Sequence, residues 1–65
     1  MQLIAVITTV DRTEDARRMA REAVESRLAA CAQLEEIEST YHWNDVLENA
    51  HEIRITFKTR AALWP

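Results

Sequence analysis

The sequence contains no glycine and only one cysteine among its 65 residues. Phosphate-binding loops of the Walker and dinucleotide types need glycine, because only a residue without a Cβ lets the backbone approach the ligand closely. Those two kinds of nucleotide site are therefore excluded. A single cysteine cannot form an internal disulfide, and no cysteine and histidine stand at zinc-ligand spacing. The two usual supports of a very small fold are therefore missing.

The chain also has too few residues to bury a large core. A domain of about 60 residues buries only about 60% of the surface that its unfolded chain exposes, so its stability is marginal. We interpret residues 1–65 as a single domain that is incomplete by itself. Its remaining surface would then be covered by further sequence or by other chains.

Charge and composition exclude several classes of function. Eight basic and eleven acidic residues are intermixed along the sequence and give a net charge of −3. No basic stripe is therefore available to neutralise phosphates, and nucleic acid is not an expected partner. No serine, histidine and acid constellation and no carboxylate pair in an apolar context is evident, which argues against an enzyme. The N-terminus carries no leading positive charges and no cleavage site, and its apolar run is too short to span a bilayer. We expect a reduced, cytoplasmic protein without a membrane anchor.

Hydrophobic periodicity predicts a strand followed by a helix. Residues 3–7 form a continuous apolar run, typical of a central strand that is buried on both faces. Asp11 and Glu14 stand three apart ahead of an apolar period, as in a capping box, and predict a helix from about Arg12. The apolar positions of that helix are Ala16, Met19, Ala20, Ala23, Val24 and Leu28.

Two further strands are predicted after the helix. Residues 30–43 read as extended, with a bend or bulge at the glutamates of 35–38, and Asn44-Asp45 and Glu48-Asn49 are turn signals. From Glu52 the alternation is clean, with Ile53, Ile55 and Phe57 on one face. Thr59 looks like the N-cap of a second helix that has barely begun at residue 65.

This order predicts an α+β fold. A strand, helix, strand and antiparallel strand, followed by the start of a helix, make the first half of the split βαβ or ferredoxin-like plait. Without the second half, half of one sheet face would stay bare and would expose Ile53, Ile55 or Phe57 unless something covers it. We expect further sequence or another chain to cover it.

Several short segments together resemble the CutA family of divalent-cation tolerance proteins. They are Ile7-Thr8-Thr9-Val10, Leu28-Ala29-Ala30-Cys31, Ser39 to Trp43 with its Tyr-x-Trp, Glu52 and Lys58-Thr59. The resemblance implies a ferredoxin-like subunit in a tight homotrimer built by strand pairing between subunits, similar in fold to PII-type signalling proteins. It also implies a link to copper and other divalent cations, and further sequence beyond residue 65, including a second helix and a strand.

Cys31 is the candidate metal ligand, because thiolates favour Cu(I) and zinc. A lone cysteine that enters a strand is also commonly a small buried hydrophobe, and this alternative stays open. His42 and His51 could join the cysteine, but the alternation places both in exposed or loop positions, where histidines are usually solvated.

Tyr41 and Trp43 lie on one face of the second strand and could stack a ligand, but such pairs more often pack in a core or at a subunit interface, and an interface is the first choice here. Glu52 and Lys58 share a face of the third strand. In the family, the matching residues help to line a cleft between subunits, while the alternative is a solvated strand face.

Three functions follow as hypotheses. The first is a non-enzymatic, trimeric CutA-type protein that takes part in the response to metal ions and could bind copper through Cys31. The second is a PII-like sensor or signalling adaptor that binds an anionic small molecule beside Lys58 in the cleft between subunits. The third is a purely structural trimer module.

Overall fold

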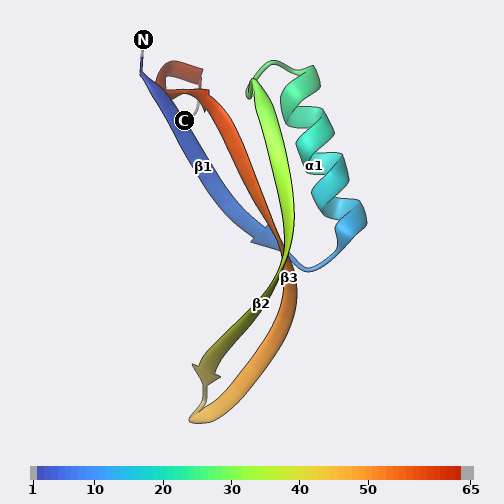
Figure 1. The fold of residues 1–65 in the computed structure, drawn as a ribbon, viewed down its shortest axis with the longest axis vertical. Coiled ribbons are helices and arrows are strands. Elements are labelled where there is room, and N and C mark those ends of the chain that lie inside the picture. The colour runs from blue at the N-terminus through green and yellow to red at the C-terminus, as the bar shows by residue number, and fades with distance from the viewer. Residues whose placement is uncertain (1, 64–65) are drawn as a thin grey trace.

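The computed structural model describes residues 2–63, which form one three-stranded sheet with a helix on one face (Figure 1). In chain order the elements are β1 (Leu3–Val10), α1 (Thr13–Glu25), β2 (Cys31–Trp43), β3 (Val46–Arg60) and a 3₁₀ turn, η1 (Ala61–Leu63). The predicted order of strand, helix and two strands is confirmed.

The strand order in the sheet is β1-β3-β2, and β3 runs antiparallel to both neighbours. β1 and β2 therefore point in the same direction, as a split βαβ arrangement requires. The prediction that residues 3–7 form a central strand is wrong for the described chain, because β1 lies at the edge and pairs only with β3. Its burial alternates, and Leu3 and Ile7 are exposed on the face away from the helix.

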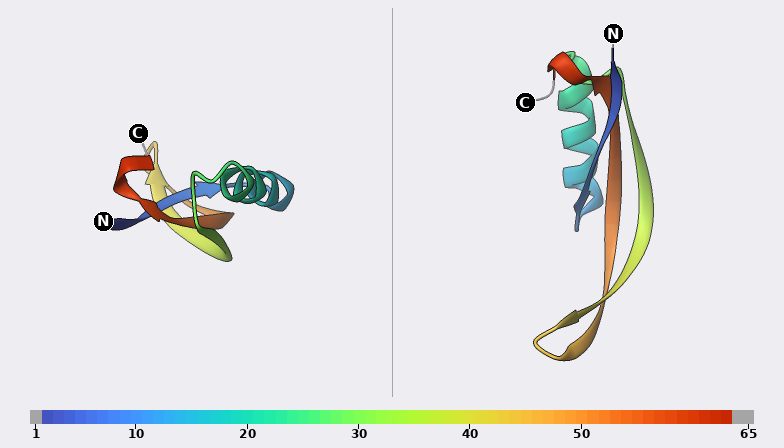
Figure 2. Two further views of the ribbon diagram at one scale, coloured as in Figure 1. Left: turned by 90° about the horizontal axis from the view of Figure 1, so that it is seen from above. Right: turned by 90° about the vertical axis from the view of Figure 1, so that its left-hand side faces the viewer.

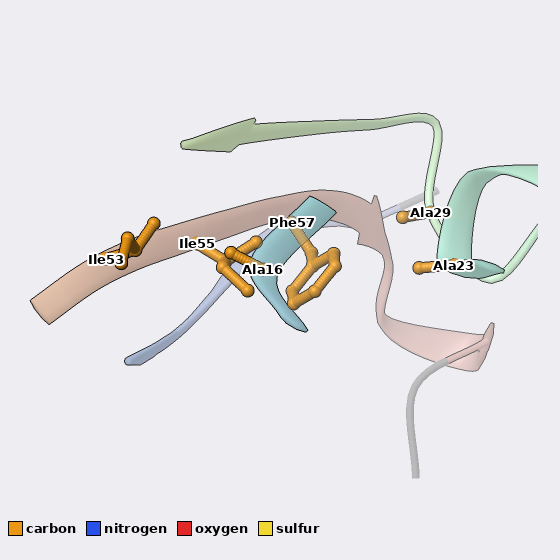
Figure 3. Packing of buried hydrophobic residues seen from close by; sticks show 6 residues of the cluster. All are labelled: Ala16, Ala23, Ala29, Ile53, Ile55 and Phe57. Carbon is orange, nitrogen blue, oxygen red and sulfur yellow. The ribbon is translucent and has the colours of Figure 1, made fainter. Parts of the chain in front are cut away.

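The core lies between α1 and the centre of the sheet (Figure 3). Ala16 and Ile55 are both 0% exposed, because the alanine's small side chain lets the helix approach β3 closely. The other buried hydrophobic residues are Ala23, Ala29, Ile53 and Phe57. The expected bare face at Ile53, Ile55 and Phe57 is therefore wrong, since α1 covers these three side chains. The uncovered sheet face is the opposite one.

The two ends of α1 differ from the expected caps. Its N-cap is Arg12 without a side-chain cap hydrogen bond, so the capping box of Asp11 and Glu14 does not form. At the C-terminus the Arg27 amide donates to the Val24 carbonyl at 3.1 Å, and the Leu28 amide donates to Ala23 at 3.0 Å. This is the Schellman pattern, and it ends the helix at Glu25. The apolar period of the sequence had predicted a helix that reaches Leu28.

The Schellman turn places Arg27 in the left-handed region, at φ 64°, where glycine is usual and a Cβ costs about 1 kcal/mol. We expect Arg27→Gly to raise the free energy of unfolding by about 1 kcal/mol. Arg21→Gly is the matched control: it removes the same charge but from the middle of α1, where glycine costs about 1 kcal/mol. Urea unfolding followed by circular dichroism measures both. Equal losses in the two variants would contradict the assigned helix end.

β2 and β3 form one long hairpin around a tight turn at Asn44-Asp45. Both turn residues have positive φ, 51° and 62°, as a type I′ hairpin turn requires. The pairing runs without interruption from Cys31 opposite Lys58 to Trp43 opposite Val46. The predicted bulge at 35–38, the second turn at Glu48-Asn49 and the late start of the strand at Glu52 are therefore wrong. The glutamates tolerate regular pairing because their side chains are exposed.

The distal half of this hairpin projects beyond the rest of the molecule. β1 ends opposite Ile53, so residues 37–52 pair only with each other, and we call them the arm. Figure 1 shows the arm extending past α1 and β1, and the right view of Figure 2 shows it curving toward the side of the helix. The molecule measures 43 × 24 × 16 Å as a result.

Thr59 belongs to β3 and is not a helix cap. It is 3% exposed, and its hydroxyl donates a hydrogen bond to the Leu28 carbonyl in the turn after α1. The expected second helix begins after β3 as the 3₁₀ turn η1. Residues 64–65, the remainder of that prediction, lie outside the described residues. The hydrogen bond from Thr59 to Leu28 therefore joins the connection between α1 and β2 to the end of β3.

Candidate functional site

Cys31 lies at the end of the sheet where β1 begins, α1 has ended and β3 runs into η1. It is the first residue of β2 and is half-buried, directly opposite Lys58 on β3. Lys58 in turn stands opposite Ala5 of β1, so these three residues form one row across the sheet. The Ala30 amide donates to the Lys58 carbonyl at 2.8 Å and fixes the start of β2 beside this row.

A cavity of about 700 Å³, which we call the cleft, opens at this end of the sheet. Most of its lining is apolar: Leu3, Ile4, Ala5, Val24, Ala29, Ala30 and Leu63. Arg27, Lys58 and Arg60 also line it, together with Cys31 and Thr59. No carboxylate is among its lining residues, so the cleft combines an apolar wall with positive charge.

The three cationic side chains of the cleft have no acidic partner among residues 2–63. The ion pairs of that part of the chain join Arg18 to Asp15, Arg54 to Glu35 and His51 to Glu38. Arg27 and Arg60 were not anticipated from the sequence, because they are 33 positions apart and only the fold brings both to the Cys31 row. The charge of the cleft is therefore available to a ligand or a partner.

Glu52 lies away from the cleft. The Ser39 hydroxyl donates to a Glu52 carboxylate oxygen at 3.4 Å, and Glu52 lines a separate cavity with Asp11, Asp15 and Arg18 among others. Glu52 and Lys58 share a sheet face, as their even spacing predicts, but Lys58 lines the cleft and Glu52 lines the other cavity. Their joint role in a cleft between subunits stays a prediction.

Tyr41 and Trp43 lie on one face of the arm, opposite Glu48 and Val46. Trp43 is 66% exposed and Tyr41 is also exposed, so within one chain neither is a core residue. The interface role of Tyr41 and Trp43 stays a prediction. Within residues 2–63 neither side chain packs in the core.

The two histidines do not join Cys31. The His51 Nε2 atom is 3.8 Å from a Glu38 carboxylate oxygen on the arm, and both side chains are mostly exposed. His42 lies opposite Leu47, one residue before Trp43. Residues 2–63 contain no group of three or more His, Cys, Asp and Glu side chains able to hold a metal ion. Within residues 2–63, Cys31 is therefore not part of a three-ligand cluster.

Comparison with known proteins assigns the chain to a family. A family model described as "CutA1 divalent ion tolerance protein" matches residues 4–65. The chain belongs to the CutA1 family. This match includes every candidate site residue named above, from Cys31 to Lys58, and it confirms the resemblance that those residues carry.

CutA1 relatives agree in sequence and in fold. The divalent-cation tolerance protein CutA of Thermococcus kodakarensis is 38% identical over 64 residues, which are 98% of this chain and 62% of the relative. The CutA1 structure from Shewanella sp. SIB1 superposes with a TM-score of 0.89 at 31% identity, over 97% of this chain and 60% of that one. The Archaeoglobus fulgidus structure, named a periplasmic divalent cation tolerance protein, gives 0.86 at 31% identity, over 95% and 61%. The ferredoxin-like fold predicted from the sequence is confirmed.

This CutA1-family chain spans about three fifths of the length of those relatives. The relatives are named for tolerance of divalent cations and not for a reaction. No helix within residues 2–63 is long and apolar enough to cross a membrane.

Proposed function

We propose that the protein takes part in the tolerance of divalent metal ions as a non-enzymatic homotrimer in a reduced, cytoplasmic compartment, and that it binds copper through Cys31. The family membership carries this proposal. The names of the relatives supply the link to divalent cations, and the thiolate is the soft ligand that copper in its Cu(I) state prefers.

The proposed copper site is shared between copies of the chain. Residues 2–63 of one copy contain no group of three metal-ligating side chains around Cys31, and a single thiolate does not fill the coordination shell of a soft metal ion. In this proposal the remaining ligands come from other copies of the chain. We therefore expect less than one copper ion per chain, with binding present only in the assembled form.

A trimer also accounts for the exposed surfaces. Among residues 2–63 no layer covers either face of the arm, and large side chains are exposed at its end. The outer edge of β1 is an uncharged strand without proline, the kind of edge that pairs readily with another strand. A lone 65-residue chain with such surfaces would associate through them.

Native mass spectrometry, with and without Cu(I) under reducing conditions, tests this function. The expected result is an assembly of three 7.5 kDa chains that gains a defined number of copper ions, fewer than three. Cys31→Ser should lose copper while the assembly persists. Met19→Leu is the matched control, because it removes a thioether sulfur from α1 that does not line the cleft, and it should keep copper binding.

The two parts of the proposal can fail separately. Copper retained by Cys31→Ser would remove the metal site and leave the trimer standing. A monomeric mass at micromolar protein would remove the trimer, and with it any site shared between copies.

A further inference from the structure

We draw no further inference here: the strongest candidate, the exposed pair of Glu38 and His51 side chains that stand opposite each other on the arm, is not part of a group of three or more metal-ligating side chains within residues 2–63, and nothing else in the structure points to a ligand there.

Discussion

Replacing Ile55 by alanine should cost about 2–5 kcal/mol of unfolding free energy. Ile55 is fully buried in the middle of β3 and packs beneath Ala16 of α1 (Figure 3). Truncation removes its transfer free energy and leaves a cavity that the alanine-rich helix cannot fill, because Ala16 has no side-chain atoms to move into it. Natural domains are stabilised by roughly 0.05–0.15 kcal/mol per residue, so the loss is of the same order as the whole stability of a 65-residue chain.

Leu34→Ala is the matched control for Ile55→Ala. Leu34 stands directly opposite Ile55 on β2 and on the same sheet face, but it is 37% exposed and lies outside the buried cluster. Leu34→Ala should therefore lower the free energy of unfolding by clearly less than Ile55→Ala does. Urea unfolding at several protein concentrations, followed by far-ultraviolet circular dichroism, measures both variants and separates folding from assembly. Equal losses would mean that the core is not centred on Ile55.

The predictable part of the fold depended on periodicity. The alternation of Ile53, Ile55 and Phe57 marked one face of a strand, and all three are buried on one face of β3. The apolar stripe of α1 was visible for the same reason. Both patterns are local, and each is dictated by the burial of one face of a regular element.

The errors in the fold arose where tertiary context overrode a local signal. Asp11 and Glu14 have the spacing of a capping box, yet Arg12 occupies the N-cap position. The continuous apolar run of β1 suggested two covered faces, but in the described chain it is an edge strand. The glutamates of β2 suggested a bulge, although exposed side chains permit regular pairing. Sheet position and register depend on which strands meet, and a single strand's sequence does not carry that information.

The candidate site was predictable only in part. Cys31 and Lys58 were singled out from the sequence, and they stand directly opposite each other across β2 and β3. The cleft around them was missed, because Arg27, Arg60 and Leu63 join it from three separate segments of the chain. The exposed aromatic residues of the arm were noticed from the sequence, but the projection of the arm beyond β1 and α1 follows only from the register of the three strands.

Thr59 links two parts of the chain, so its substitution should also lower the free energy of unfolding. The Thr59 hydroxyl donates to the Leu28 carbonyl, and the Ala30 amide donates to the Lys58 carbonyl. These two hydrogen bonds tie the α1–β2 connection to the end of β3 immediately before Cys31. Because Arg27 holds a left-handed conformation in the same connection, the link also retains a backbone geometry that is unfavourable for a residue with a Cβ.

Thr59→Val keeps the shape of the side chain and removes its donor, so the partly buried hydrogen bond to the Leu28 carbonyl is lost, at a cost of about 1–3 kcal/mol. Thr59→Ser is the matched control, since it keeps the hydroxyl and removes one methyl group, at about 1 kcal/mol. Urea unfolding gives the two free energies. The rate at which the Cys31 thiol reacts with a disulfide reagent reports the local structure, because a loosened connection exposes the start of β2.

The valine variant should therefore show both a larger loss of stability and a faster thiol reaction, whereas the serine variant should keep the wild-type reaction rate. If the Cys31 thiol of Thr59→Val reacts at the wild-type rate or more slowly, the Thr59 hydroxyl contributes to stability without positioning Cys31. If serine accelerates the reaction as much as valine, packing of the methyl group and not the hydrogen bond holds the connection in place. Only the first pattern makes Thr59 the residue that couples the turn after α1 to the wall of the cleft.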